Sequence, residues 1–436
     1  MLPRVSSSQH KTEMKKSLIL IIWLGLTLFI SPYLFAEASR VEIKTTKENG
    51  YYLTVNNKPF LIKGIIYNPT PICRGYDYEF FNDASKQWLV DGKLMKEAGI
   101  NCIRIYSTGE DLDKVKAFIN EMYNKFGIYT IVSDWLGLWS YPGVNYADSQ
   151  FQKNTKERML KIVEALKDEK GLLMWVLGNE NSYTFSGKIC FWTCPEIDKM
   201  KDLRKQIEKR AQIYYTFVNE LTVEIKKIDK NHPVALGNGE ESFLDIAAKV
   251  CNDIDVLAVI SYRGKKFGNL FDHIKTYSDK PIFISEFGAD SYDSYTEKEA
   301  QDIQAEYITS QWNNLFEHTV FSKNMQGNCL GGTLFEWSDE WWKHNEGYTP
   351  DWCTHNSEAG WSNGSYYFDI KAKNNGLNMS EEWFGIVALS DKKIKGTDID
   401  QRVPKKSYYA LKNFLNSISK QSQKISQGST GKSGAK

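Results

Sequence analysis

The sequence has few of the side chains that build metal sites. Its 436 residues include six histidines and seven cysteines. No histidine has a second histidine or a cysteine at the spacing of a zinc site, and the cysteines are scattered along the chain. We therefore predict no metal ion and no cofactor.

The sequence also has almost no net charge. The 55 lysines and arginines balance 54 aspartates and glutamates, and no basic stripe interleaved with aromatic residues is present. These absences argue against a nucleic-acid partner. No internal repeat and no second segment with its own core are visible. Aromatic residues, in contrast, are plentiful, with 13 tryptophans and 24 tyrosines. Their flat rings suit the C–H faces of sugars.

One long hydrophobic run lies near the N-terminus. It extends from Leu18 to Phe35, follows several lysines, is broken by Pro32 and is followed by Ala36-Glu37-Ala38. This pattern predicts a signal peptide over residues 1–38. Because the run is about long enough to span a bilayer, an uncleaved membrane anchor over residues 17–36 is the alternative. In both cases we expect the rest of the chain to be secreted or periplasmic.

The remaining chain divides into one domain and a tail. We predict a single catalytic domain over residues 39–418. Residues 419–436 are rich in Ser, Gln, Gly and Lys and are expected to be disordered. Cys190 and Cys194 could form a local disulfide, whereas Cys73, Cys251 and Cys353 cannot be paired from the sequence.

Eight apolar runs rich in β-branched residues predict eight strands. They are Phe60–Tyr67, Asn101–Ser107, Tyr129–Trp135, Leu172–Glu180, Pro233–Asn238, Ile254–Tyr262, Pro281–Gly288 and Cys329–Trp337. Helix-like segments lie between them, such as Gln87–Ala98, Asp111–Phe126 and Lys153–Lys167. Strands and helices that alternate eight times predict an α/β fold, the (β/α)8 TIM barrel.

Three other segments complete the predicted architecture. Val41–Lys58 alternates in polarity around an Asn56-Asn57 turn, which predicts a short N-terminal hairpin that closes the bottom of the barrel. Ser182–Asp202 and Ser338–Asp400, after the fourth and eighth strands, are too long for plain connections. Because both leave the carboxyl end of the barrel, we interpret them as walls of a substrate cleft.

Two of the apolar runs end in a glutamate beside a glycine. Glu180 ends the run WVLGNE, and Glu286 lies in PIFISEFG. A carboxylate at the end of a buried strand is unfavourable unless it opens into a polar cleft. Two such carboxylates are what the cleavage of a glycosidic bond needs, because one protonates the leaving oxygen and the other attacks the anomeric carbon.

These motifs resemble clan A of the retaining glycoside hydrolases. GIIYNP at Gly64–Pro69, NCIRIYS at Asn101–Ser107 and GIYTIVSD at Gly127–Asp134 resemble the β-1,3-glucanosyltransferases of family 72. VNNKPFLIKG at Val55–Gly64 and LFEWSDEWW at Leu334–Trp342 are similar to the barrels of family 2 exo-glycosidases.

The resemblance implies a role for each glutamate. Glu180 would be the general acid/base, with a pKa raised by burial and by the neighbouring anion, and Glu286 would be the nucleophile. Arg104 is then the expected counter-ion of the nucleophile, and Tyr262 is expected to donate a hydrogen bond to it. Asn179 should contact the sugar 2-hydroxyl.

Five further residues at strand ends are expected to bind substrate. Trp337 would form the floor under the reacting sugar. Tyr67 and Asn68 end the first barrel strand, and Asp134 and Trp135 end the third, so all four are candidate cleft residues.

Glu336, Asp339 and Glu340 also cluster at a strand end, but they lack the sequence context of the catalytic pair. One of them could bind sugar hydroxyls.

The sequence therefore predicts an exported retaining β-glycosidase or transglycosylase that acts on β-glucan or a related oligosaccharide. The alternatives are an exo-acting enzyme of the β-mannosidase, β-galactosidase or β-glucuronidase type, and an inactive glycan-binding barrel. Whether water or a second sugar completes the reaction, and the oligomeric state, stay open.

Overall fold

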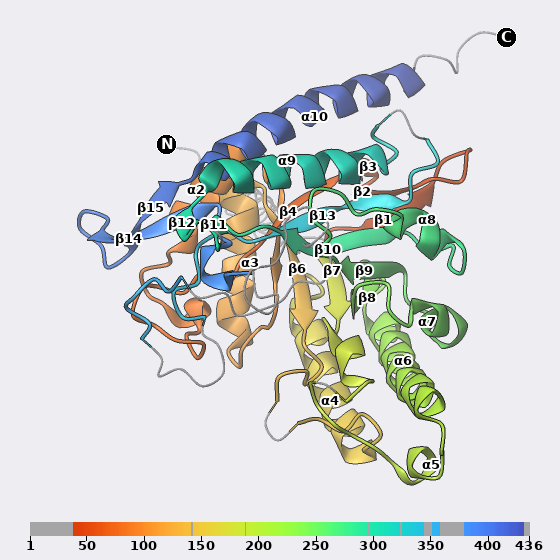
Figure 1. The fold of residues 1–436 in the computed structure, drawn as a ribbon. Coiled ribbons are helices and arrows are strands. Elements are labelled where there is room, and N and C mark those ends of the chain that lie inside the picture. The colour runs from red at the N-terminus through yellow and green to blue at the C-terminus, as the bar shows by residue number, and fades with distance from the viewer. Residues whose placement is uncertain are drawn as a thin grey trace, which may run out of the picture. The chain divides into compact units, whose positions relative to one another are not determined.

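A closed barrel of eight parallel strands forms the centre of the protein (Figure 1). The computed structural model describes residues 38–430 except 141–142, 188, 295, 323–324, 344–350 and 358–378, with the backbone alone for 420–430. The barrel strands are β4 (Ile62–Ile66), β5 (Cys102–Ile105), β6 (Tyr129–Asp134), β7 (Leu172–Leu177), β8 (Val234–Gly239), β9 (Val256–Ile260), β10 (Ile282–Gly288) and β13 (Cys329–Phe335). Each lies within a predicted run or ends one residue beyond it, so the predicted TIM barrel is confirmed.

Helices surround the barrel. They are α2 (Trp88–Ala98), α3 (Leu112–Phe126), α4 (Ser149–Leu166), α5 (Pro195–Asp198), α6 (Leu203–Ile228), α7 (Leu244–Val250), α8 (Leu270–Lys275), α9 (Gln301–Glu317) and α10 (Lys406–Thr430). Their apolar faces and the outward-facing strand residues form the main buried cluster, in which Phe118 of α3 and Ile103 of β5 take part. Helix α4 begins before the predicted Lys153, because the Asp148 side chain accepts hydrogen bonds from the backbone N–H groups of Gln150 and Phe151.

A small antiparallel sheet closes the amino end of the barrel. It contains β1 (Val41–Thr45), β2 (Tyr51–Val55) and β3 (Lys58–Phe60), and it has one more strand than the predicted hairpin. Asn56 and Asn57, both with positive φ, make the predicted turn between β2 and β3. Leu53 and Val55 are buried in one cluster with Ile62 of β4 and Leu173 of β7.

Long segments extend from the other end of the barrel. Ser182–Asp202 contains part of the 3-10 helix η2 (Asn181–Thr184) and all of α5. The segment after β13 contains the 3-10 helix η4 (Glu381–Trp383) and the strand β14 (Val387–Lys393), which pairs with β15 (Asp400–Pro404). A short ladder of β11 (Tyr292–Asp293) and β12 (Lys298–Glu299) follows β10.

The sequence also predicts a signal peptide at the N-terminus and a disordered tail at the C-terminus. Residues 1–37, which include almost all of the predicted signal peptide, lie outside the described residues. Helix α10 continues to Thr430, so helix occupies the first part of the tail that was expected to be disordered. Among the described residues, none of the helices has the length and apolar character needed to cross a membrane.

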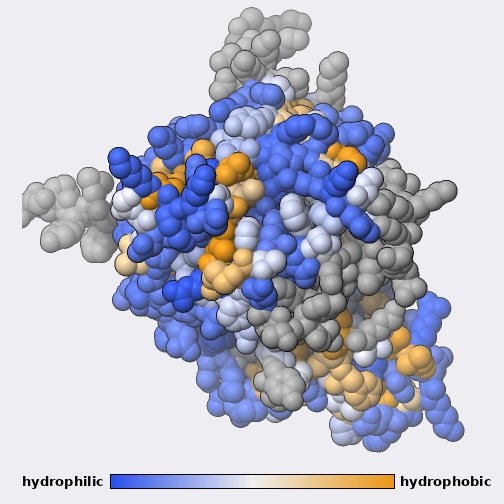
Figure 2. Space-filling model, turned by 60° about the vertical axis from the view of Figure 1, so that its left-hand side comes forward, coloured by the Kyte–Doolittle hydropathy of each residue, from blue (hydrophilic) through white to orange (hydrophobic). Residues whose placement is uncertain are grey.

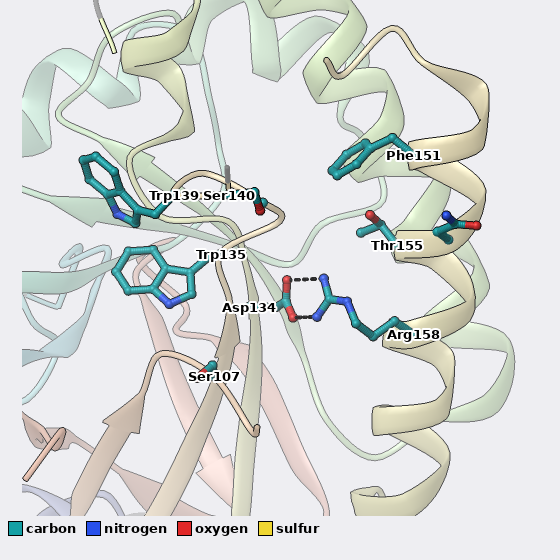
Figure 3. Close-up of a pocket in the computed structure, with 10 residues that line it drawn as sticks. Ser107, Asp134, Trp135, Trp139, Ser140, Phe151, Thr155 and Arg158 are labelled. Carbon is teal, nitrogen blue, oxygen red and sulfur yellow. Dashed lines mark hydrogen bonds and ion pairs between the residues drawn. The ribbon is translucent and has the colours of Figure 1, made fainter. Parts of the chain in front are cut away.

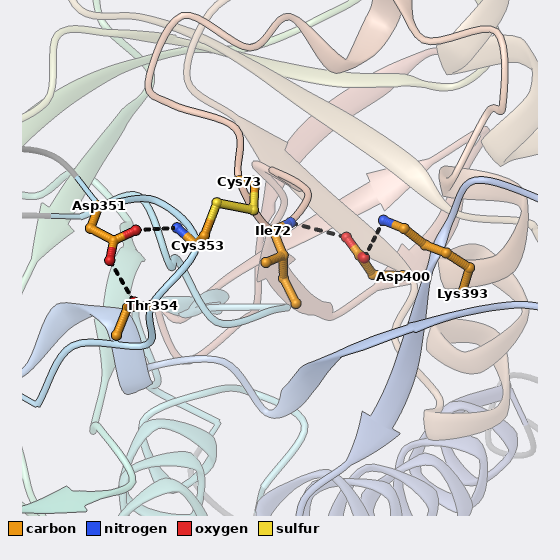
Figure 4. Close-up of a disulfide and its surroundings, with 7 residues drawn as sticks. All are labelled: Ile72, Cys73, Asp351, Cys353, Thr354, Lys393 and Asp400. Atoms are coloured by element: carbon orange, nitrogen blue, oxygen red, sulfur yellow. Dashed lines mark hydrogen bonds and ion pairs between the residues drawn. A yellow bond between two sulfur atoms is a disulfide. The ribbon is translucent and has the colours of Figure 1, made fainter.

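One disulfide joins the loop after β4 to the loop after β13 (Figure 4). It pairs Cys73 with Cys353, which are 280 positions apart, and the backbone N–H of Cys73 also donates to the Trp352 carbonyl at 2.8 Å. Cys190 and Cys194 are both free, so the local disulfide suggested for them is wrong. The disulfide fixes two walls of the barrel mouth to each other.

Removing this disulfide should destabilise the fold. We expect Cys353→Ser to lower the free energy of unfolding by about 2–4 kcal/mol, because the unfolded chain loses a constraint that spans most of its length. Urea unfolding of the oxidised protein measures the loss. Cys194→Ser is the matched control, because it removes a free and half-buried thiol. Equal losses in the two variants would contradict the expectation.

Candidate active site

The two predicted glutamates lie at the carboxyl ends of β7 and β10. Glu286 belongs to β10 and is 8% exposed, whereas Glu180 follows β7 and is half-buried. The turn into Glu180 requires Gly178, which has a φ of 84°. A Cβ at this position would lie 2.2 Å from the Tyr214 hydroxyl oxygen. The glycine of the Gly-Asn-Glu motif therefore shapes the turn that presents the carboxyl group.

Two tyrosines hold the Glu286 carboxylate. The Tyr106 hydroxyl donates to Oε2 at 2.6 Å, and the Tyr262 hydroxyl donates to Oε1 at 2.8 Å. The Tyr262 bond was predicted, whereas Tyr106 was not. Tyr106 lies two positions after Arg104, so strand alternation places both side chains on one face, and this period could have identified it. Its ring centroid lies 4.9 Å from the Arg104 guanidinium carbon.

Arg104 is the buried cation beside Glu286. Its Nη1 lies 3.7 Å from Glu286 Oε2, and the side chain is fully buried. Its nitrogens also donate to the Ser133 hydroxyl at 2.9 Å, the Ser285 carbonyl at 2.9 Å and the Asn179 side-chain oxygen at 2.7 Å. The last bond orients the Asn179 amide, so its NH2 group is the part that can donate to a sugar hydroxyl.

The surroundings of the two carboxyl groups differ. Within the described residues, the Glu180 carboxyl receives no hydrogen bond, and burial together with the Glu286 charge raises its pKa to about 8. Burial also raises the pKa of Glu286, but Arg104 and the hydroxyls of Tyr106 and Tyr262 oppose that rise by stabilising the carboxylate. Of the two carboxyl groups, Glu180 is therefore the one that favours the proton, and Glu286 is the one whose charge is stabilised by hydrogen bonds and a cation.

The structure places two predicted cleft residues in the hydrophobic core. Trp337 is fully buried among the residues that pack the barrel against the helices, with its ring 6.4 Å from that of Tyr408. Tyr67 is also fully buried, and its hydroxyl donates to Asp91 of α2 at 2.8 Å. Neither ring reaches the cleft, so both predictions are wrong. Phe335, which ends β13, shares a cluster with Tyr106 and Tyr262 instead.

The other predicted residues lie at the barrel mouth. Trp135 is half-buried and stacks on Tyr106, with ring centroids 4.6 Å apart. The Asp134 carboxylate accepts hydrogen bonds from Arg158 and from the Leu136 N–H, so it is occupied within the protein. The Asn68 side chain lies near Glu340 and lowers the pKa of that carboxyl.

An acidic cluster follows β13 at the same mouth. Glu336, Asp339 and Glu340 are almost fully buried, and Glu381 is half-buried. Lys343 lies 3.6 Å from Glu340 Oε2 and 3.0 Å from Glu381 Oε2. Burial raises the pKa of Glu340 to about 7 and that of Glu336 well above its ordinary value. Glu381 also raises the pKa of both Glu180 and Glu286, which places the cluster beside these two carboxyl groups.

The acidic cluster has the side chains of a metal site but not their arrangement. No group of three or more His, Cys, Asp or Glu side chains in the described part of the chain could hold a metal ion.

A closed parallel barrel with two glutamates at its carboxyl end defines the class as the TIM-barrel glycoside hydrolases of clan A. The chain belongs to glycoside hydrolase family 72, whose family model, described as glucanosyltransferase, matches residues 33–345. The predicted clan and the resemblance to family 72 are therefore confirmed.

Curated relatives carry the same family name. The 1,3-beta-glucanosyltransferase GAS4 of Saccharomyces cerevisiae is 26% identical over 328 residues, which cover 72% of this chain and 62% of that enzyme. The 1,3-beta-glucanosyltransferase gas4 of Schizosaccharomyces pombe is 21% identical and covers 71% of this chain. The chain thus spans less than two thirds of these relatives.

Solved structures share the barrel fold. The family 1 β-glucosidase of Thermotoga maritima has a TM-score of 0.53 at 11% identity and covers 86% of this chain and 99% of that one. The β-glucuronidase 2 of Bacteroides uniformis has a TM-score of 0.52 at 16% identity, covering 85% of this chain and 37% of that one.

The raised pKa of Glu180 predicts a pH-dependent loss of stability. An unfolded glutamate releases its proton near pH 4.5, whereas folded Glu180 retains it to about pH 8, so the folded state binds more protons between these values. Stability therefore falls as the pH rises through this window. Glu180→Gln removes the effect and should be more stable than the wild type at pH 8 by roughly 1–4 kcal/mol.

Urea unfolding at pH 4 and at pH 8 measures this difference, which should vanish at pH 4. The exposed Glu110→Gln is the control for the substitution itself. A difference between wild type and Glu180→Gln that stays the same at both pH values would contradict the prediction.

Proposed function

We propose that this protein is a retaining β-1,3-glucan transglycosylase, with Glu180 as the general acid/base and Glu286 as the nucleophile. The observation that carries the proposal is the contrast between the two carboxyl groups. Glu286 has one cation and two hydroxyl donors that stabilise its charge, whereas none of the described residues donates a hydrogen bond to the Glu180 carboxyl. Membership of family 72 supplies the substrate class.

In the first step, Glu286 attacks the anomeric carbon of a glucosyl residue as the glycosidic bond breaks. Glu180 transfers its proton to the departing oxygen, so the leaving sugar departs as a neutral alcohol. The product is an ester between the anomeric carbon and Glu286. Because the Glu286 charge is consumed in this bond, the pKa of Glu180 falls, and the newly formed carboxylate can act as a base.

In the second step, Glu180 removes a proton from the hydroxyl of an incoming sugar. The hydroxyl oxygen attacks the anomeric carbon, and the bond to Glu286 breaks. Two inversions give net retention. The released Glu286 carboxylate returns to Tyr106, Tyr262 and Arg104, and Glu180 holds a proton again. Water in place of the sugar gives hydrolysis.

We also propose that the enzyme works outside the cytoplasm. The support is the predicted N-terminal signal and the disulfide between Cys73 and Cys353, because disulfides persist in oxidising compartments.

Covalent trapping tests the assignment of the nucleophile. A 2-deoxy-2-fluoro β-glucoside with a good leaving group should esterify Glu286, which mass spectrometry of the digested protein locates. Glu286→Gln should escape labelling and lose turnover of β-1,3-glucan by about 10⁴-fold or more. Glu340→Gln, a change to a neighbouring buried acid, should still be labelled at Glu286. Labelling of any other carboxylate would reject the assignment.

The exo-glycosidase alternative includes enzymes that act on uronides, and the charge of the site argues against that substrate. Burial raises the pKa of Glu340 to about 7 and that of Glu336 well above its ordinary value, although Lys343 lies beside the cluster. The same burial and the neighbouring acids would oppose the ionised form of a sugar carboxylate placed here. The site therefore favours a neutral sugar.

Substrate competition measures this preference. The kcat/KM for an aryl β-glucoside should exceed that for the matching β-glucuronide by about 100-fold or more, which corresponds to about 2.7 kcal/mol. Glu340→Gln should reduce the ratio. Asp302→Asn, on exposed α9 surface, is the control that should leave it unchanged. A wild-type enzyme that accepts the glucuronide equally well would contradict the charge argument.

A further inference from the structure

A pocket of about 510 Å³ lies beside the catalytic centre (Figure 3). Its walls come from the end of β5, the end of β6, the loop that follows β6 and the first turns of α4. The lining includes Ser107, Asp134, Trp135, Trp139, Ser140 and Arg158. The volume lies in the range of small-molecule sites, which is about 300–1,000 Å³.

Trp135 connects this pocket to the reacting groups. Trp135 lines the pocket, and its ring stacks on Tyr106, which donates to the Glu286 carboxylate. Its carbonyl accepts a hydrogen bond at 2.9 Å from the side chain of Asn181, the residue after Glu180. Trp135 is therefore connected to Glu286 through Tyr106 and to Glu180 through Asn181.

The lining has the chemistry of a sugar subsite. Trp139 lines the pocket and is 55% exposed, and in Figure 3 its ring lies on the same side of the loop after β6 as that of Trp135. Flat indole faces suit the C–H faces of a pyranose ring. Ser107 and Ser140 supply hydroxyl groups that donate or accept hydrogen bonds.

The residues that line the pocket have no net charge. Asp134 and Arg158 form an ion pair with each other, in which Arg158 Nη2 donates to Asp134 Oδ1 at 2.9 Å. They are the charged residues of the lining, and their charges cancel. This pair positions α4 against the end of β6 and leaves a neutral surface, which fits a neutral sugar and not an ionic ligand.

On the face in Figure 2, hydrophilic residues predominate, and apolar residues gather in small groups among them. A singly exposed aromatic residue needs no explanation on such a surface. Trp139 differs from that case because it lines a pocket together with a second tryptophan and with hydroxyl groups. The second tryptophan, Trp135, stacks on Tyr106, which donates a hydrogen bond to Glu286.

We infer that this pocket is an additional subsite that binds a glucosyl unit of the β-glucan next to the reacting residue, with Trp139 as its stacking platform. The inference rests on the proposed function. The bound unit belongs either to the chain that is cleaved or to the chain that accepts the glycosyl group, and both present the same neutral pyranose.

Kinetics with β-1,3-gluco-oligosaccharides of graded length test the subsite. Trp139→Ala should raise the KM for long substrates by about tenfold and leave kcat unchanged, because one stacking contact is lost. The shortest substrate that is turned over should be unaffected. Trp139→Phe keeps a ring and should restore most of the affinity, and unchanged thermal unfolding confirms that the variants are folded.

Tyr409→Ala is the matched control. It removes an aromatic side chain of nearly equal exposure, 54%, from α10, which contributes nothing to the pocket. It should leave the KM unchanged at every length. A Trp139→Ala variant whose KM is unchanged or rises equally for all lengths, and whose ratio of transfer to hydrolysis is also unchanged, would overturn the subsite.

A labelled acceptor separates the two sources of the bound unit. If the unit belongs to the accepting chain, Trp139→Ala lowers the ratio of transfer to hydrolysis. If it belongs to the cleaved chain, the KM for the donor rises and the ratio stays constant. A wild-type protein that turns over no β-1,3-glucan defeats the proposed function together with the subsite, whereas turnover with unaltered length dependence and an unaltered ratio of transfer to hydrolysis in Trp139→Ala defeats the subsite alone.

Discussion

The hydrogen bonds of the buried Arg104 guanidinium group hold the candidate active site together. This group bonds to Ser133 at the end of β6, to the carbonyl of Ser285 in β10 and to Asn179 after β7, and it lies 3.7 Å from Glu286. A buried cation without such partners would be strongly unfavourable. The same contacts that satisfy it therefore hold three strand ends in register across the barrel mouth.

The different properties of the two glutamates follow from this arrangement. The two tyrosine hydroxyls donate to Glu286, and Arg104 stabilises the Glu286 carboxylate, whereas burial and the Glu286 charge raise the pKa of Glu180. Burial disfavours a further negative charge in the acidic cluster around Lys343. The disulfide between Cys73 and Cys353 joins the loops after β4 and β13, two walls of the same mouth.

The strands and the two glutamates could be predicted from the sequence because one local pattern determines each of them. The barrel strands are buried on both faces, so each is a nearly continuous apolar run, and both glutamates lie where such runs end. Trp337 and Tyr67 were misplaced because strand alternation stops with β13 and β4, at Phe335 and Ile66, and beyond those points the packing of α10 and α2 decides which way a ring points. The disulfide was out of reach, because no local rule relates two cysteines 280 positions apart.

We infer that Glu180 and Glu286 form one electrostatically coupled pair. Titration of the side-chain carboxyl carbon of Glu180 by ¹³C NMR, in the wild type and in Glu286→Gln, measures this coupling. We expect a pKa of about 8 in the wild type and a clearly lower value in the variant, because the neighbouring anion is gone while burial remains. The same pKa in both proteins would show that the two carboxyl groups are not coupled.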